Sequence, residues 1–190
     1  MHEAKHITGP TPYASIRDFC RIFHEETDSL YRLSFLLTAD CDKAEQCFVS
    51  GLEDSVKGSR VFKEWARSWA RRAIIQNAVR VTNPRPTAKD APSEVNSSGT
   101  TPVAKQAGIA AVLELAPFER FVYVMSVLER YSDQDCSVLL GCMRRDVGAA
   151  RIRALQQIGS AMELRLEQQV NVGSRPVHGL QLAPSLASLA

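Results

Sequence analysis

The sequence lacks any long hydrophobic run. No apolar stretch approaches the roughly 20 residues that a membrane-spanning helix needs. The opening segment Met1–His6 is polar where a signal peptide would carry an apolar core. We therefore expect a protein of the cytoplasm with no membrane segment.

Histidines and closely paired cysteines are also scarce. The chain has four histidines, of which only His24 lies away from the ends, and its five cysteines form no Cys-x-x-Cys pair. Metal sites and disulfide frameworks need such pairs or clusters, and no nucleophile-elbow, phosphate-loop or zinc-helix motif is present. We expect no catalysis, no metal and no cofactor. We interpret the cysteines as small core residues: Cys20, Cys41, Cys47, Cys136 and Cys142.

Strand-like alternation of useful length is absent, whereas apolar residues recur at helical spacing, which predicts an all-α fold. With 190 residues, of which 45% are hydrophobic, the chain can form packed cores. We predict two small helical domains, over 13–81 and 104–169. A flexible linker rich in Pro, Ser and Thr joins them at 82–103, and an N-terminal tail (1–12) and a low-complexity C-terminal tail (170–190) complete the division.

Positive charge is concentrated rather than abundant. The net charge of +2 is too small to attract a polyanion by itself, but the segment from 60 to 85 holds seven bases and one acid. On a helical projection, bases fall on one side and aromatic residues on the other, where they would anchor the helix. Such a stripe suits a phosphate backbone, and the alternative is a basic face that balances the acidic helices beside it. The bases are Arg60, Lys63, Arg67 and Arg71, and the aromatic residues are Phe62, Trp65 and Trp69.

Residues 116–158 predict three successive helices. Pro117 suits a first helical turn, and apolar residues then recur at helical spacing as far as Leu128. Ser132 with an acid three residues later forms a capping-box pattern that begins a short second helix. Gly141 permits the positive φ of a tight turn before a longer third helix.

The third helix has a predicted buried face and a predicted outward face. The buried residues are Val147, Ala150, Ala154, Ile158 and Ala161, and the outward residues are Arg145, Ala149, Ile152, Arg153 and Gln156. A short helix, a glycine turn and a longer helix with outward arginines is typical of a recognition helix presented to a DNA groove. The alternative is a three-helix bundle whose arginines are simply solvated.

Several short motifs follow one another in a recognisable order. The first half carries Leu30–Leu33, Leu37–Asp40, Ala44–Glu45 and the Phe62-x-x-Trp65 pair. The second half carries Ala116–Arg120, Tyr131–Asp135, Leu139–Gly141, Val147 and Arg153–Ala154. Over most of the chain this order and spacing resembles the two-domain extracytoplasmic-function sigma factors of bacterial RNA polymerase.

The resemblance implies that the first domain binds the polymerase clamp and the −10 promoter element, and that the second reads the −35 element in the major groove. The implied partners are promoter DNA and core RNA polymerase, with an anti-sigma factor as a further candidate. The candidate DNA contacts are Arg144, Arg145, Arg151 and Arg153 in the second domain and Arg60, Lys63, Arg67, Arg71 and Arg72 in the first. The candidate polymerase contacts are Ala44, Glu45 and Gln46.

The chain departs from this family pattern at several positions. Gln46–Gly51 replaces further acids and a Gln that contact the polymerase, and Arg71–Arg72 replaces an Arg-Asn pair. Asp146 and Ala149 stand where the family has hydroxyl residues. The carboxylate of Asp146 would repel a phosphate, or it would cap the helix. Arg151 then falls near the buried face, where its stem would pack and its head would reach outward.

These departures leave a second hypothesis open. The chain would then be a sigma-like protein that kept the fold, lost contacts to polymerase or promoter, and binds a regulatory protein through apolar surfaces.

Overall fold

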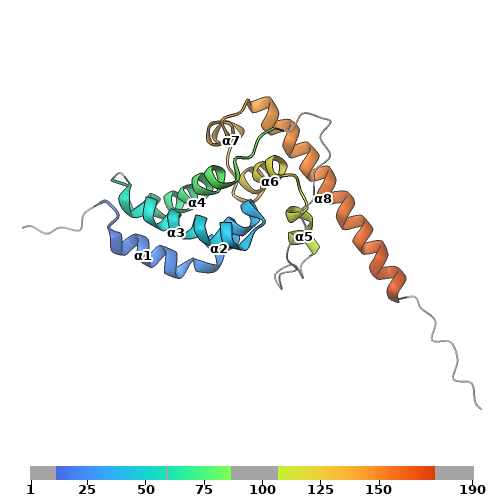
Figure 1. The fold of residues 1–190 in the computed structure, drawn as a ribbon, viewed down its shortest axis with the longest axis horizontal. Helices are drawn as coiled ribbons and strands as arrows, with labels where there is room; N and C mark the ends of the chain where they lie inside the picture. Colours follow the sequence, from blue (N-terminus) through green and yellow to red (C-terminus); the bar gives the residue numbers. More distant parts are fainter. Residues whose placement is uncertain (1–11, 59, 87–106, 174–190) are drawn as a thin grey trace, which may run out of the picture.

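The computed structural model describes residues 12–58, 60–86 and 107–173, and it confirms the all-α prediction. In these ranges the backbone is helical apart from turns and one isolated antiparallel bridge between Tyr13 and Phe62. The first bundle consists of α1 (Ile16–Glu25), α2 (Thr27–Thr38), α3 (Cys41–Lys57), the 3₁₀ turn η1 (Lys63–Trp65) and α4 (Ala66–Thr82). The second consists of α5 (Ala107–Leu113), α6 (Pro117–Tyr123), the π-helix η3 (Val124–Leu128), α7 (Asp133–Leu140) and α8 (Arg144–Gly173) (Figure 1).

The predicted boundaries can be compared only in part. Most of the predicted linker at 82–103 lies outside the described residues, as do most of both predicted tails. Helix α8 continues to Gly173, past the predicted end of the second domain at 169. Its C-terminal part extends away from the rest of the protein (Figure 1).

Predicted local signals start and stop the helices. The Ser132 hydroxyl accepts a hydrogen bond of 3.1 Å from the backbone N–H of Asp135, which confirms the capping pattern at the start of α7. Gly141 ends α7 at φ 62°, and Pro117 occupies the first turn of α6, both as predicted. Between α2 and α3, Ala39 adopts a left-handed φ of 53°, and this turn sets the angle between the two helices.

The core of the first bundle depends on small residues at the contact between α3 and α4. Ala66, Ala70 and Ala73 are buried along α4 beside Ile74. A Cβ atom at Gly51 of α3 would lie only 2.8 Å from Cγ1 of Ile74, closer than real Cβ contacts. Glycine is therefore required at position 51 for the close approach of these two helices.

The core of the second bundle follows the predicted face of α8. Val147, Ala150, Ala154 and Ile158 are buried there, as predicted, and Ala161 is half-buried. The predicted apolar stripe before it is wrong at its end, because Leu128 is 44% exposed. The π-helix η3 inserts extra backbone per turn and rotates Leu128 away from the face that ordinary helical spacing assigns to it.

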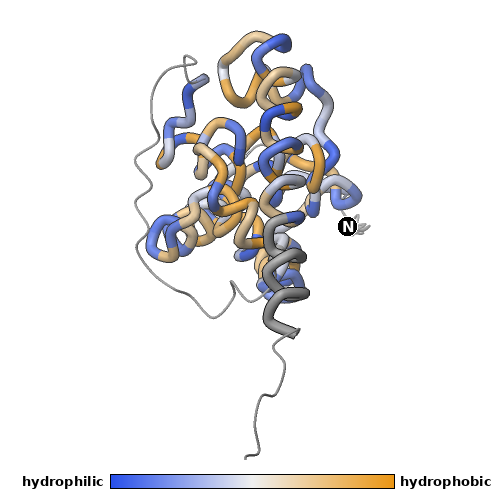
Figure 2. The backbone as a smooth tube through the Cα atoms, turned by 90° about the vertical axis from the view of Figure 1, so that its right-hand side faces the viewer, coloured by the Kyte–Doolittle hydropathy of each residue, from blue (hydrophilic) through white to orange (hydrophobic). Residues whose placement is uncertain are grey.

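The two bundles pack against each other through one continuous apolar core, and the apolar parts of the helices converge in the interior (Figure 2). Arg120 of α6 is buried at this contact, with 6% of its surface exposed. It donates to the Leu37 carbonyl at the end of α2 (3.1 Å) and to the Leu115 carbonyl after α5 (3.1 Å). Longer bonds reach the carbonyls of Thr38 (3.4 Å) and Leu113 (3.3 Å).

Arg120 donates its hydrogen bonds to backbone carbonyls at helix ends and not to a carboxylate. The last carbonyls of a helix have no partner within that helix, and a cation is favourable there because of the helix dipole. In the described part of the chain no acid forms an ion pair with Arg120, and burial lowers the pKa of its guanidinium to about 10. The contact therefore joins α2, α5 and α6 through one side chain.

A second polar contact between the bundles is an ion pair. Arg71 of α4 donates to both carboxylate oxygens of Glu129, at 2.7 and 2.9 Å. Both side chains are largely buried, with 28% and 13% of their surface exposed. The hydrogen bonds to Glu129 raise the pKa of Arg71 further above its usual value.

Candidate nucleic-acid interface

Two exposed arginines of the second bundle lie where α8 begins. After the left-handed turn at Gly141, Arg144 and Arg145 occupy the first turn of α8, and both are exposed. The Arg145 side chain is 78% exposed. Among the described residues no acid forms an ion pair with Arg144, so its guanidinium can bind an external anion.

Asp146 belongs to the helix start itself. Its carboxylate accepts a hydrogen bond of 3.3 Å from the backbone N–H of Met143, and it lies in the first turn, where a negative charge is favourable. This is the capping role left open for it above. Arg145 Nε lies 3.8 Å from its Oδ1, an exposed contact that adds little to stability.

The other two arginines predicted on this helix are engaged elsewhere. Arg151 pairs with Asp133 of α7, through Nη1 and Oδ1 and, at 3.3 Å, through Nη2 and Oδ2. Arg153 was predicted to point outward, and this is wrong in part: it is half-buried and donates to Oε1 of Glu119 at 2.8 and 3.1 Å. These two arginines hold α8 against α7 and α6.

Glu119 is a functional residue of the scaffold that sequence reasoning missed. It is 3% exposed; among the described residues its Oε1 has a partner, and its buried Oε2 has no hydrogen bond. A buried carboxylate needs a compensating charge, and Arg153 supplies it. In the sequence, only its place between aromatic residues, directly before Arg120, could have indicated that Glu119 is buried.

The predicted aromatic anchor of the basic stripe is wrong for two of its three residues. Phe62 and Trp65 are 38% and 60% exposed, because η1 precedes α4 and the α-helix begins only at Ala66. Alanines anchor α4 instead. Only Trp69, which is half-buried, packs against the core as predicted.

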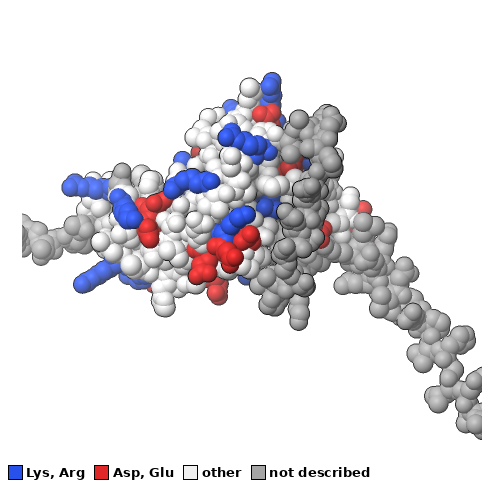
Figure 3. Space-filling view, viewed as in Figure 1, with Lys and Arg blue, Asp and Glu red and all other residues white. Residues whose placement is uncertain are grey.

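Two members of the basic stripe are neutralised within the chain. Arg67 pairs with Glu26 and, at 3.0 Å, with Glu25, at the junction of α1 and α2. Arg71 pairs with Glu129 and, at 3.4 Å, with Glu26. On the side of the molecule seen in Figure 3, acidic and basic side chains lie next to each other in several places. For these two arginines the geometry favours the alternative given above, a basic face balanced by acidic helices.

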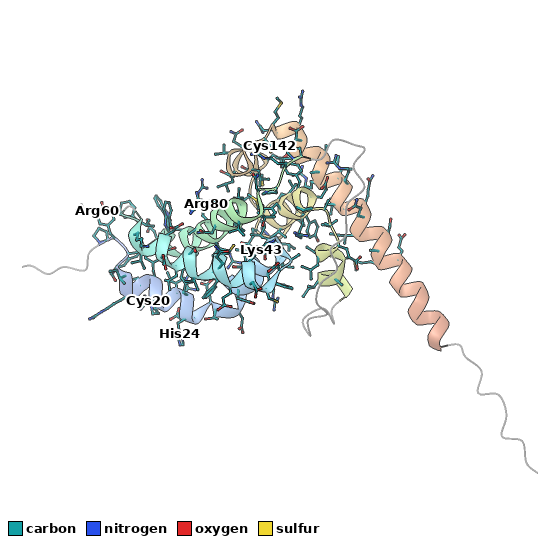
Figure 4. All side chains as sticks on the ribbon, in the orientation of Figure 1. Cys20, His24, Lys43, Arg60, Arg80 and Cys142 are labelled. Atoms are coloured by element: carbon teal, nitrogen blue, oxygen red, sulfur yellow. The ribbon has the colours of Figure 1, made fainter. Side chains whose placement is uncertain are left out.

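The other three bases predicted to contact DNA from the first bundle are Arg60, Lys63 and Arg72. Arg60 lies over the ring of Tyr13 at 5.8 Å, at the end of the first bundle far from α8 (Figure 4). Lys63 lies 4.0 Å from the carboxylate of Asp18 and is otherwise exposed. Arg72 is half-buried and forms no ion pair with any described residue.

Of the three candidate polymerase contacts, two are exposed and one is buried. Glu45 and Gln46 are exposed on α3, but Ala44 is fully buried, so its side chain cannot contact a partner. The altered segment Gln46–Gly51 ends in a glycine. A side chain at position 51 would collide with Ile74.

The cysteines are not all core residues. Cys47 and Cys136 are buried as predicted, and burial raises the pKa of each thiol to about 11. Cys20 and Cys41 are exposed, which contradicts the prediction, and Cys20 points away from α1 near His24 (Figure 4). Position 20 lies beside the buried face of α1, which consists of Phe19, Ile22 and Phe23. The described side chains form no group of three potential metal ligands.

Fold and site together define an all-α protein of two packed bundles with exposed arginines at the start of its longest described helix. No described helix combines the length and hydrophobicity needed to cross a bilayer. No family model and no curated protein matches the chain. A solved structure of the sigma factor RpoE in complex with the anti-sigma factor NepR from Bartonella quintana is similar at 16% identity and a TM-score of 0.44. That match covers 77% of this chain and 98% of that one.

Proposed function

We propose that this protein is a divergent sigma factor of the extracytoplasmic-function type. It binds core RNA polymerase and promoter DNA in the cytoplasm, with α7 and α8 acting as a helix-turn-helix. The support comes from the order of sequence motifs described above and from the geometry at the start of α8. It acts by binding and not by catalysis.

The observation that carries this proposal is the exposure of Arg144 and Arg145 directly after the Gly141 turn. In helix-turn-helix proteins, side chains at the N-terminal end of the second helix contact base edges. Arg151 and Arg153 then position that helix and make no base contact, because their guanidinium groups are paired with Asp133 and Glu119.

The first test is binding to core RNA polymerase. The full chain should co-purify with core polymerase under conditions in which a known sigma factor does. The resulting holoenzyme should select specific duplexes from a random pool. If neither binding nor selection occurs, the sigma-factor proposal is wrong.

The second test addresses the two arginines. On a selected duplex, Arg144→Ala and Arg145→Ala should each weaken binding roughly 5- to 150-fold, because a base-edge contact contributes about 1–3 kcal/mol. Arg17→Ala, an exposed arginine on α1, is the matched control and should leave the affinity unchanged. Circular dichroism should show the same helix content in all three variants.

A second candidate function is favoured by a different observation. Four of the predicted DNA-binding arginines are paired with acids that lie outside their own helix: Arg67, Arg71, Arg151 and Arg153. Val138, Met143 and Ile152 around the start of α8 are 63%, 59% and 58% exposed. Exposed apolar residues suit a protein partner. Under this hypothesis the chain binds a regulatory protein without initiating transcription. Val138→Ser and Ile152→Ser would then abolish partner capture, whereas Arg144→Ala would not.

A further inference from the structure

A surface cleft of about 500 Å³ lies where the two bundles meet. One wall consists of Trp65, the last residue of η1, and of Trp69 and Arg72 on α4. The other wall comes from the turn between η3 and α7 and includes Arg130 and Tyr131. We call it the junction cleft. Its volume lies within the range of about 300–1,000 Å³ of small-molecule sites.

The charges that line the junction cleft do not cancel. Arg71 and Glu129 neutralise each other through two hydrogen bonds. Asp135 is held in the cap of α7, where its carboxylate accepts a hydrogen bond of 2.5 Å from the hydroxyl of Ser132. Arg72 and Arg130 form no ion pair with any described residue, so two guanidinium groups remain for an external anion.

Arg130 is held in this position by an unusual backbone. Its φ is +59°, a region that non-glycine residues rarely occupy. The next residue is fixed by a hydrogen bond of 2.9 Å from the Tyr131 backbone N–H to the Met125 carbonyl. A left-handed residue followed by this backbone hydrogen bond is a common way for a helix to end, so the end of η3 fixes the position of Arg130 beside the cleft.

Aromatic rings complete the junction cleft. Trp65 is 60% exposed, although a side chain of this size is usually more buried. Tyr131 is half-buried, and burial raises the pKa of its phenol. The charge of Arg72 opposes that rise, because the guanidinium of Arg72 lies near the phenol of Tyr131. The cleft thus offers one accessible indole, one phenol and two unpaired guanidinium groups.

We propose that the junction cleft binds a nucleoside phosphate, whose base stacks on the indole of Trp65 while Arg72 and Arg130 bind the phosphate. Stacking of a base on an aromatic side chain contributes about 1–3 kcal/mol, and the planar fork of arginine matches phosphate oxygens. A single nucleotide is favoured over a longer strand because only two guanidinium groups in the cleft have no ion pair with a described residue.

Occupancy of the junction cleft would also change how the bundles associate. The ligand contacts α4 on one side and the turn before α7 on the other. Any molecule that binds only the packed arrangement stabilises it by mass action. The inference does not depend on the proposed function, because none of these contacts involves Arg144 or Arg145.

The chain provides its own probe for this test. It contains two tryptophans, Trp65 and Trp69, and both line the junction cleft. Adenosine and guanosine diphosphates are titrated into the full chain, with free tryptophanamide as the optical control. At least one should change the fluorescence saturably. Inorganic phosphate and the uncharged nucleosides should bind at least about tenfold more weakly, because each supplies only one of the two contacts.

Variants separate the site from a non-specific effect. Arg72→Ala and Arg130→Ala should each weaken nucleotide binding at least about fivefold, the effect of losing one charge-assisted contact. Arg144→Ala is the matched control: it leaves the cleft unchanged and impairs only DNA binding under the proposed function. Circular dichroism confirms that each variant is folded.

Four outcomes would overturn the inference. The first is the absence of any saturable signal, and the second is equal binding of phosphate alone. The third is unchanged affinity in both arginine variants. The fourth is binding of a single-stranded oligonucleotide at least about tenfold tighter than of a mononucleotide, which would assign the cleft to a strand instead.

Discussion

Replacing Arg120 by Met removes the polar contact that joins the two bundles while keeping much of the side-chain volume. In the native protein, burial lowers the pKa of this guanidinium from 12.5 to about 10. At about 1.4 kcal/mol per unit, this corresponds to roughly 3 kcal/mol against the charged group. That penalty is the quantity that the hydrogen bonds of Arg120 must exceed.

Four backbone carbonyls oppose the penalty. Each hydrogen bond from a charged donor contributes about 1.5–3 kcal/mol, and two of the four are long, at 3.3 and 3.4 Å. We take their sum as about 6–8 kcal/mol, which leaves a net stabilisation of about 3–5 kcal/mol. Arg120→Met should therefore lower the free energy of unfolding by that amount. Arg120→Lys should lower it less, because it keeps the charge but lacks the planar fork.

Urea unfolding followed by circular dichroism measures this difference. With a slope of about 2–3 kcal/mol per M, the midpoint of Arg120→Met should fall by roughly 1–2.5 M. A Met variant as stable as the native protein would refute the reasoning. It would show that burial of this charge costs at least as much as its hydrogen bonds contribute, as happens for some buried ion pairs.

Three further predictions concern packing, thiol reactivity and acid stability. Gly51→Ala should destabilise the protein, because overpacking costs about 1–3 kcal/mol. Gly148→Ala adds a Cβ with no atom within 4 Å and should stabilise the protein by about 0.5–1 kcal/mol. Urea titration measures both changes. Native alkylation followed by peptide mapping should modify Cys20 roughly a hundredfold faster than Cys47, whose thiol is buried with a pKa raised to about 11; equal rates would contradict the packing of α3. The hydrogen bond from Arg80 lowers the pKa of Asp54 below 3.8, so its stabilisation is complete above that pH and is lost as the pH falls through the lowered value. Asp54→Asn should accordingly flatten the loss of stability below about pH 4 in urea midpoints.

Local sequence signals predicted local structure well. Ser132, Gly141 and Pro117 each act at a helix end, where the preference of one residue and its near neighbours decides the conformation. The buried face of α8 was predictable for the same reason, since a regular helix converts residue spacing directly into a face.

Predictions failed where an irregular turn changed the spacing or where a distant partner was needed. The π-helix moved Leu128 to the surface, and the 3₁₀ turn before α4 exposed Trp65, because neither follows ordinary helical spacing. Arg153 looked solvated because its partner Glu119 lies 34 positions earlier. Charge pairing across such a distance depends on the packing of whole helices, which helical periodicity does not describe.

The same reasoning limits what could be predicted of the candidate interface. Arg144 and Arg145 were predictable because the start of a helix after a glycine turn is a local feature. The pairing of Arg71 with Glu129 was not, since these residues belong to different bundles and are 58 positions apart.

The contact between α2 and Arg120 also has a consequence during synthesis. The Leu37 carbonyl at the end of α2 is made 83 residues before its partner. At roughly 5–20 residues per second, the ribosome needs about 4–16 seconds to reach it. During that interval water hydrates the last carbonyls of α2. The apolar surface of α2 that later packs against α6 is exposed to other molecules. We therefore expect a nascent chain that stops before position 120 to recruit chaperones more strongly than one that extends past α8.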